Sequence, residues 1–289
     1  MVWDNTTLTY NGKEQAPTAS VAATDLCGTD TCEITVSGAK TTVGSGYSAS
    51  AIGSNSNYEL QGTNTVFKIQ PKALTVTAKD TTIFSGEEIP ADAIAFDGLV
   101  KGEELQVSIT SDYSADDAYD ANNTEFTMTP VVTEDSASKN YTITYVSGTL
   151  TVEPVVYKYK DGSKEAKTLS LTYTKSSNKD VTFTSAGEYE DFVAFYLDGI
   201  KVDSANYTVK ESSPTVLTLK SSYLDTLSTG KHTVKFEFKH GATEEGTLTI
   251  KEQTKAAKTG DSATPALWAL LCVLSVTGLG YTATRRKHN

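Results

Sequence analysis

The sequence has few of the residues that build catalytic and metal sites. It contains only three histidines and three cysteines, and their spacing fits neither a four-ligand zinc site nor a helical H-E-x-x-H motif. It also lacks a nucleophile elbow and a phosphate-binding glycine loop. His232 and His240 are expected in exposed turns without a partner, and His288 lies near the C-terminus. We therefore expect no catalysis, cofactor or metal within these residues.

Basic residues are scarce in the first half of the chain. Residues 1–154 contain 21 acidic and 7 basic residues, whereas the remainder contains 15 and 18, and the net charge is −11. Nucleic-acid binding requires a basic surface, so the composition argues against a nucleic-acid partner. This charge is compatible with a soluble extracellular surface.

The first residues lack the basic and apolar regions of a secretory signal peptide. Residues 1–5 lead directly into the strand-like residues 8–10. If the protein is exported, we expect the sequence to be the C-terminal part of a longer protein or to carry a misplaced start.

Long apolar runs are absent except for one near the C-terminus. Residues 266–283 are uncharged, Pro265 precedes them, and the basic residues Arg285, Arg286 and Lys287 follow. At about 1.5 Å per residue, the run forms about 27 Å of helix, close to the roughly 30 Å of a bilayer core. We expect a transmembrane helix at 265–284 and a cytoplasmic tail at 285–289, with the rest outside the cell. A mostly β chain has no place for a buried helix that is apolar on all faces.

The segment before this run contains Lys258, Thr259, Gly260 and Asp261. The motif, the apolar run and the basic tail together resemble the cell-wall sorting signal of Gram-positive surface proteins (LPXTG-like), although Ala256-Ala257 replaces the Leu-Pro pair. The resemblance implies that the transpeptidase sortase cuts between Thr259 and Gly260 and joins Thr259 to peptidoglycan. The alternative is a plain single-pass membrane anchor. Both interpretations place the protein at the cell surface.

Cys27 and Cys32 bracket the turn-forming residues 28–31 and could close a small disulfide loop in an oxidising compartment. Two free thiols are the alternative. Cys272 lies in the apolar run.

Clusters of carboxylates offer weak candidates for chemistry. Residues 112–123 could supply oxygens to Ca²⁺, but they lack the glycine and terminal glutamate of an EF-hand, so we favour a solvated acidic loop. The pairs Glu87-Glu88 and Glu244-Glu245 would point to opposite faces of a strand, which is unsuitable for paired acid–base work.

An internal repeat occupies the first half of the chain. Asn57 to Pro71 and Asn140 to Pro154 have the same spacing, and the two copies are 83 residues apart. A shared offset over several landmarks indicates an array of similar modules. Each copy is predicted to close with two short strands joined by a turn, which in the second copy contains Ser147-Gly148. A single helical turn is expected within residues 96–103.

Residues 3–154 resemble the MBG-type repeat modules of bacterial surface proteins. The likeness is carried by residues 8–13, 72–78, 98–103 and 140–152. It implies small all-β modules used in series and no enzymatic activity.

Residues 155–252 form a different unit. Strands are predicted at 167–174, 181–184, 192–197, 207–210, 216–220, 232–239 and 246–251. Seven short strands with regular turns predict a β-sandwich, with a helical turn packing Leu224 and Leu227 onto one end. This unit resembles the X2-type immunoglobulin-like module, and the resemblance implies that it is a spacer. The likeness is carried by residues 198–199, 206–209, 217–224, 227–230 and 233–238.

The sequence thus predicts an all-β fold of tandem modules with a C-terminal transmembrane helix. The expected divisions are MBG-like modules at 1–72 and 73–154, an Ig-like sandwich at 155–252, a linker with the sorting motif at 253–264, the helix at 265–284 and the tail at 285–289. The predicted function is a non-catalytic stalk anchored to the wall. The alternatives are adhesive modules that bind host glycan or protein, and the stalk of a carbohydrate-active enzyme whose catalytic domain lies upstream.

Overall fold

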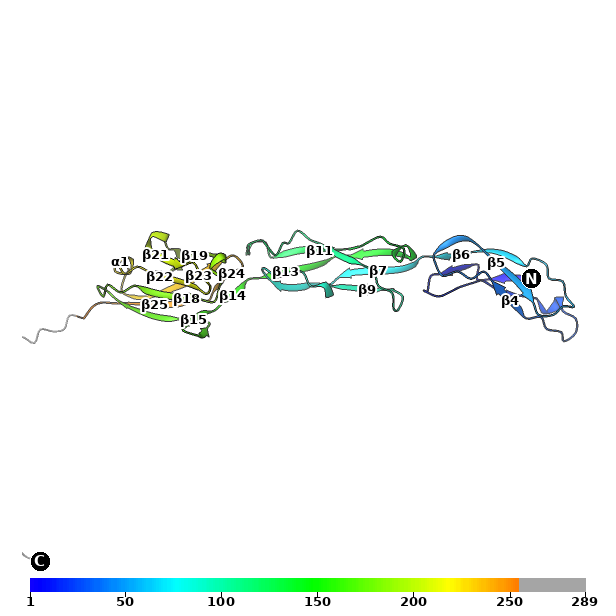
Figure 1. The fold of residues 1–289 in the computed structure, drawn as a ribbon, viewed down its shortest axis with the longest axis horizontal. Coiled ribbons are helices and arrows are strands. Elements are labelled where there is room, and N and C mark those ends of the chain that lie inside the picture. Colours follow the sequence, from blue (N-terminus) through cyan, green and yellow to red (C-terminus); the bar gives the residue numbers. More distant parts are fainter. Residues whose placement is uncertain (255–289) are drawn as a thin grey trace, which may run out of the picture.

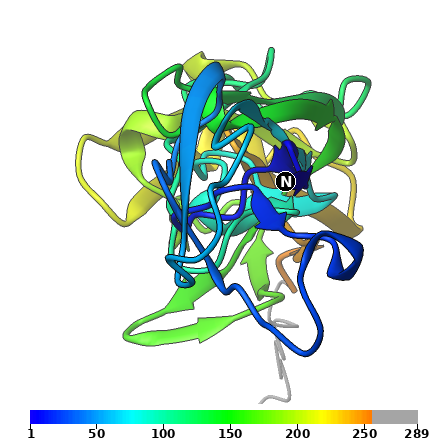
Figure 2. The same ribbon diagram turned by 90° about the vertical axis from the view of Figure 1, so that its right-hand side faces the viewer.

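The computed structural model describes residues 1–254, and β-strands dominate them, so the all-β prediction is confirmed. The strands form three groups that pair only among themselves. We call them the first module (residues 2–70), the second module (72–153) and the third module (155–251). The modules lie end to end (Figure 1), and a view along the row places one behind another (Figure 2).

The first module combines a four-stranded sheet with a two-stranded one. Its strands are β1 (Val2–Asp4), β2 (Thr7–Thr9), β3 (Thr18–Ser20), β4 (Ile34–Ser37), β5 (Gly44–Gly53) and β6 (Asn64–Gln70), with a 3₁₀ turn at Ala23–Asp25. β2 runs parallel to β6, and β5 and then β4 continue the sheet antiparallel. β1 pairs with β3.

The second module repeats this order in its larger sheet. Its strands are β7 (Lys72–Ala78), β8 (Thr81–Phe84), β9 (Ile94–Asp97), β10 (Val107–Thr110), β11 (Glu125–Val132), β12 (Tyr141–Val146) and β13 (Gly148–Glu153), with 3₁₀ turns at Ala91–Ala93 and Ser138–Asn140. β8 runs parallel to β13, and β11 and β10 follow antiparallel. The order β8-β13-β11-β10 therefore matches β2-β6-β5-β4. A smaller sheet places β7 between β12 and β9.

The two strands predicted to close the second module are present as β12 and β13. They do not pair with each other, because β12 pairs with β7 in the smaller sheet and β13 joins the larger one. The chain crosses between the sheets at Gly148, where a side chain would collide with the carbonyl of Ala78. The helical turn predicted within residues 96–103 is wrong. β9 extends to Asp97, and a β-turn closes from Glu103 N to Val100 O at 3.0 Å.

The third module consists of two facing sheets. One contains β14 (Val155–Tyr157), β17 (Ser170–Thr174), β19 (Phe192–Leu197), β20 (Ile200–Lys201), β23 (Gly230–Phe238), β24 (Gly241–Thr243) and β25 (Gly246–Lys251). The other contains β15 (Tyr159–Asp161), β16 (Lys164–Ala166), β18 (Val181–Ser185), β21 (Tyr207–Lys210) and β22 (Thr215–Leu219). The remaining elements are 3₁₀ turns at Tyr189–Asp191 and Ser204–Asn206 and the helical turn α1 (Ser221–Leu224). All seven predicted strands are present, and β14, β15, β16, β20 and β24 were not predicted.

Strand alternation gives the third module its core. Along β23, Val234, Phe236 and Phe238 are buried while the side chains between them face outward. Phe183 and Leu217 meet them from the opposite sheet, so aromatic and aliphatic side chains fill the space between the layers. The predicted helical turn is confirmed, with Leu224 fully buried and Leu227 packed against the same core.

Candidate interaction sites at the module joints

The predicted sorting residues Lys258, Thr259, Gly260 and Asp261 lie outside the described residues, as do the transmembrane helix and the tail residues Arg285, Arg286 and Lys287. Within residues 1–254, no helix is long and apolar enough to cross a membrane. The same part of the chain contains no group of side chains arranged to hold a metal ion. Cys27 and Cys32 are free thiols, the first exposed and the second half-buried, and their disulfide stays a prediction.

The first joint is an apolar core shared by two modules. Phe67 and Ile69 of β6 belong to the same buried cluster as Leu74 and Val76 of β7. Tyr10, which follows β2, completes it with only 6% of its surface exposed. Burial of such side chains stabilises a protein by about 1.5–3 kcal/mol each. The first two modules are therefore joined by packing as well as by the chain.

A carboxylate fixes the polar side of this joint. Tyr10 of the first module and Tyr141 of the second each donate a hydrogen bond to Glu103, one to each oxygen. The tyrosine rings meet edge to face with centroids 5.6 Å apart. Burial, together with the hydrogen bond to Glu103, raises the pKa of both tyrosines to about 12. Both hydroxyls therefore remain donors at neutral pH.

Backbone contacts tighten the same joint. The Val43 amide, in the loop before β5, donates to the side-chain oxygen of Asn140 at 3.1 Å. Gly12 follows Tyr10 with a φ of +76°, and a Cβ there would lie 2.7 Å from Val100 Cγ1. Only glycine allows the turn to approach the second module so closely.

The second joint uses the corresponding turn after β8. The Ser85 hydroxyl lies 3.0 Å from His240 Nδ1, which belongs to the turn between β23 and β24. Gly86, with a φ of +91°, packs against the ring of His240. The Tyr119 amide, in the loop between β10 and β11, donates to the Lys239 carbonyl at 2.8 Å.

Both joints are therefore made by the same two loops of the preceding module. One is the turn after the parallel strand β2 or β8, where an aromatic residue, one other residue and a glycine follow in order: Tyr10-Asn11-Gly12 and Phe84-Ser85-Gly86. The other connects β4 to β5 or β10 to β11. The sequence predicted neither joint. The signal that could have revealed them is the aromatic–x–glycine spacing, which recurs in both copies.

The sequence-based expectation for the histidines is wrong. His232 is buried, not exposed, and its Nδ1 lies 2.6 Å from Asp198 Oδ2 while Nε2 lies 2.9 Å from the Ser228 carbonyl. Burial opposes its charge, but the hydrogen bonds to Asp198 and Ser228 outweigh burial and raise the pKa of His232. His232 lies in β23, and these two bonds tie the strand to the turn that carries Asp198 and to the segment before β23. His240 is half-buried at the second joint.

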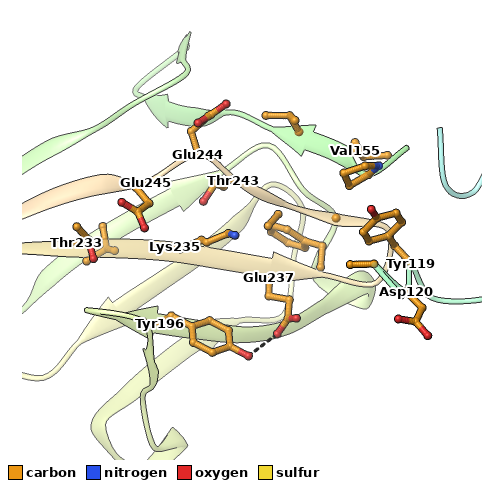
Figure 3. A pocket seen from close by; sticks show the side chains of 18 residues that line it. Tyr119, Asp120, Val155, Tyr196, Thr233, Lys235, Glu237, Thr243, Glu244 and Glu245 are labelled. Carbon is orange, nitrogen blue, oxygen red and sulfur yellow. Dashed lines mark hydrogen bonds between the residues drawn. The ribbon is translucent and has the colours of Figure 1, made fainter. Parts of the chain in front are cut away.

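A hollow of about 750 Å³ lies beside the second joint. Figure 3 shows Tyr119 and Asp120 of the second module at one end of the hollow. Strand β23, which carries Lys235 and Glu237, runs along it. Tyr196 of β19 donates to Glu237 at 2.7 Å, and this hydrogen bond, followed by burial, raises the pKa of the tyrosine. Aromatic faces beside charged side chains can stack on and hydrogen-bond a sugar.

The acidic segment 112–123 is more than a solvated loop. Asp120 accepts hydrogen bonds from the amide and side chain of Asn122, and Tyr119 contacts the third module. The loop thus closes one end of the hollow.

Residues 74–151 match the MBG domain (YGX type). This match covers nearly all of the second module and supports the MBG resemblance of that module. The MBG match includes β8, whose following turn makes the second joint, and β12, which carries Tyr141 of the first joint. Comparison with curated protein sequences gives no match.

Solved structures of modular proteins are similar at low identity. Fibronectin(III)-like modules of Clostridium thermocellum CbhA are 15% identical over 34% of this chain and 98% of theirs, with a TM-score of 0.22. Tandem immunoglobulin domains of titin are 12% identical over 63% of this chain and 94% of theirs, with a TM-score of 0.25. A tri-modular GH5 endo-β-1,4-glucanase from Bacillus licheniformis is 12% identical over 62% and 38%, with a TM-score of 0.27.

Proposed function

We propose that the chain is a non-catalytic spacer that holds other parts of a cell-surface protein away from the envelope. The observation that carries this proposal is that the two joints are built in the same way, each with buried or hydrogen-bonded contacts from the same two loops. A linear array with specific joints suits a spacer, because flexible linkers would let modules fold back on one another.

The repeated strand order supports the assignment of the modules. Residues 2–70 share the order and directions of the larger sheet of the MBG-matched module, so we assign them as a second MBG-like module. We assign the two-sheet third module as an X2-type Ig-like spacer, on the sandwich architecture and the sequence resemblance.

Covalent anchoring completes the proposed function. The motif at 258–261, the apolar run and the basic tail support cleavage by sortase between Thr259 and Gly260 and transfer of Thr259 to peptidoglycan. Sortase is then a transient partner, peptidoglycan a covalent one, and the C-terminal helix a temporary membrane contact.

The anchoring is tested by expressing the chain behind a secretory leader in a Gram-positive host that carries sortase. After digestion of the wall, mass spectrometry is expected to find C-terminal peptides that end at Thr259 joined to a peptidoglycan fragment. Thr259→Ala should abolish this species, whereas Ser262→Ala, outside the motif, should leave it unchanged. An intact C-terminus in the membrane fraction would instead establish a plain membrane anchor.

The hollow beside the second joint favours a second function, adhesion to a glycan. Tyr196, Glu237 and Asp120 would supply a stacking face and hydrogen-bond acceptors. On a glycan array, selective binding that is lost in Tyr196→Ala would support it. Tyr145→Ala is the matched control, because Tyr145 is 45% exposed on another module. Absence of selective binding would exclude this function for the glycans on the array.

A further inference from the structure

The first module carries, at the end away from the second module, the same hydrogen-bonded arrangement that receives Tyr10 at the first joint. We propose that this end is a docking surface for a further module of the same kind, which would insert its own aromatic–x–glycine turn. The inference relies on the proposed modular repeat but not on the anchoring.

The arrangement consists of a β-turn, a tyrosine and a carboxylate. In the second module, the Val100 amide donates to the Tyr141 hydroxyl at 3.0 Å, and Tyr141 donates to Glu103. In the first module, the Cys27 amide donates to the Tyr58 hydroxyl at 2.7 Å, and Tyr58 donates to Asp30 Oδ2 at 2.9 Å. In both, the acidic residue closes the turn, with Asp30 N to Cys27 O at 3.1 Å matching Glu103 N to Val100 O at 3.0 Å.

The following strands show that the two arrangements are equivalent positions. Cys27 precedes β4 by the same number of residues as Val100 precedes β10. Each of these edge strands pairs antiparallel with the strand next to it in its sheet, β5 or β11. The residue just before each strand accepts an equivalent backbone hydrogen bond. Glu33 O accepts from Ser54 N at 2.9 Å, and Gln106 O accepts from Thr133 N at 2.8 Å. This register aligns Cys32 with Leu105, a member of the shared core at the first joint.

The two arrangements differ in how far their side chains are buried. Tyr141 is 7% exposed and Asn140 also 7%, because Tyr10 and Val43 of the first module lie on them. Their counterparts Tyr58 and Asn57 are half-buried and exposed, respectively.

The contacts made at the first joint indicate what would bind to the exposed arrangement of the first module. Glu103 accepts Tyr10 on Oε1 and Tyr141 on Oε2, so an incoming tyrosine would donate to Asp30 Oδ1 beside the bond from Tyr58. An incoming glycine would pass over Cys27 as Gly12 passes over Val100. Asn57 would accept a backbone amide, as Asn140 does from Val43. A module with the Tyr10-Asn11-Gly12 turn supplies all three contacts.

The test is a tandem in which an added copy of residues 2–75 is placed directly before Val2 of the full chain. This junction keeps the strand register of the natural one, because β8 follows β2 by 74 residues. The measured quantity is amide hydrogen exchange at Cys27. We expect it to slow about tenfold or more in the tandem relative to the original chain, because one charge-assisted hydrogen bond, one neutral hydrogen bond and apolar cover are gained.

Two controls make the result specific. Tyr10→Phe in the added copy alone should restore part of the hydrogen exchange at Cys27 of the original module. Asp30→Asn in the original module should reduce the difference in Cys27 exchange between the tandem and the original chain. The Val100 amide, in the natural joint, reports on that joint in every sample. Equal exchange at Cys27 in tandem and chain, with Val100 protected in both, would overturn the docking surface while leaving the spacer intact. Unprotected Val100 would contradict the spacer itself.

Discussion

At the scale of single residues, two carboxylates each accept hydrogen bonds from two different groups. Asp198 accepts from His232 and from the Thr233 amide, the latter at 2.8 Å, and so fixes the turn between β19 and β20 to β23. Glu103 accepts two tyrosines from different modules. A buried hydrogen bond that loses one partner costs about 1–3 kcal/mol.

The His232–Asp198 pair predicts how the stability of the third module depends on pH. The pKa of His232 is raised above its ordinary 6.5, so its contribution is complete below pH 6.5 and is lost as pH rises through the folded-state pKa. Burial opposes the charge of Asp198 too, but the His232 hydrogen bond lowers its pKa below the ordinary 3.8, so its contribution is complete above pH 3.8 and is lost in acid. Chemical denaturation at pH 6 and pH 9 should show a lower free energy of unfolding at pH 9.

His232→Gln should reduce that pH dependence, and Lys231→Gln, at the exposed neighbouring position, should preserve it. If the pH dependence of His232→Gln matches that of the original chain, the histidine is not the group responsible.

Glu103→Ala should weaken the first joint. It leaves the hydroxyls of Tyr10 and Tyr141 without their acceptor, so we expect the free energy of unfolding of the first two modules to fall by about 1–3 kcal/mol. Glu104→Ala, at the next and exposed position, is the control. Equal effects from the two substitutions would show that the carboxylate does not stabilise the joint.

At the scale of elements, the turns after β2 and β8 decide how modules meet. Gly12 and Gly46 have nearly equal φ values of +76° and +73°, but a Cβ at Gly12 would press on Val100 whereas one at Gly46 would meet nothing within 4 Å. Both Gly→Ala changes therefore carry a similar backbone cost of about 1–2 kcal/mol. Only Gly12→Ala should also speed hydrogen exchange at the Val100 amide. Equal exchange in the two variants would mean that the close approach at Gly12 is not needed.

The strands also show which elements could be predicted from sequence pattern and which could not. Alternation found the longer strands of the third module, because residues such as Val234, Phe236 and Phe238 alternate with charged ones. It missed β14 and β24, because three-residue strands are too short to show a period. It placed β12 and β13 correctly, but the partner of each strand depends on contacts with β7 and β11, which are distant in sequence. The joints escaped prediction for the same reason, since Tyr10 and Glu103 are 93 residues apart.

At the scale of the whole molecule, the modules form a row with defined joints (Figure 1). The two joints differ in the contacts that hold them. The first has a shared apolar core and two tyrosine–carboxylate bonds, whereas the second depends on Ser85, Gly86 and Tyr119 against one turn of the third module. Bending under load is therefore expected at the second joint before the first.

The most direct test measures the distance distribution across each joint. Spin labels would be placed at the exposed positions Lys68 and Thr144 for the first joint, and at Thr82 and Lys231 for the second, after replacement of the cysteines by serine. We expect one narrow distance distribution across the first joint, which broadens in Glu103→Ala and Gly12→Ala, and a single but wider one across the second. A broad distribution across the first joint of the otherwise unchanged chain would contradict a row with defined joints.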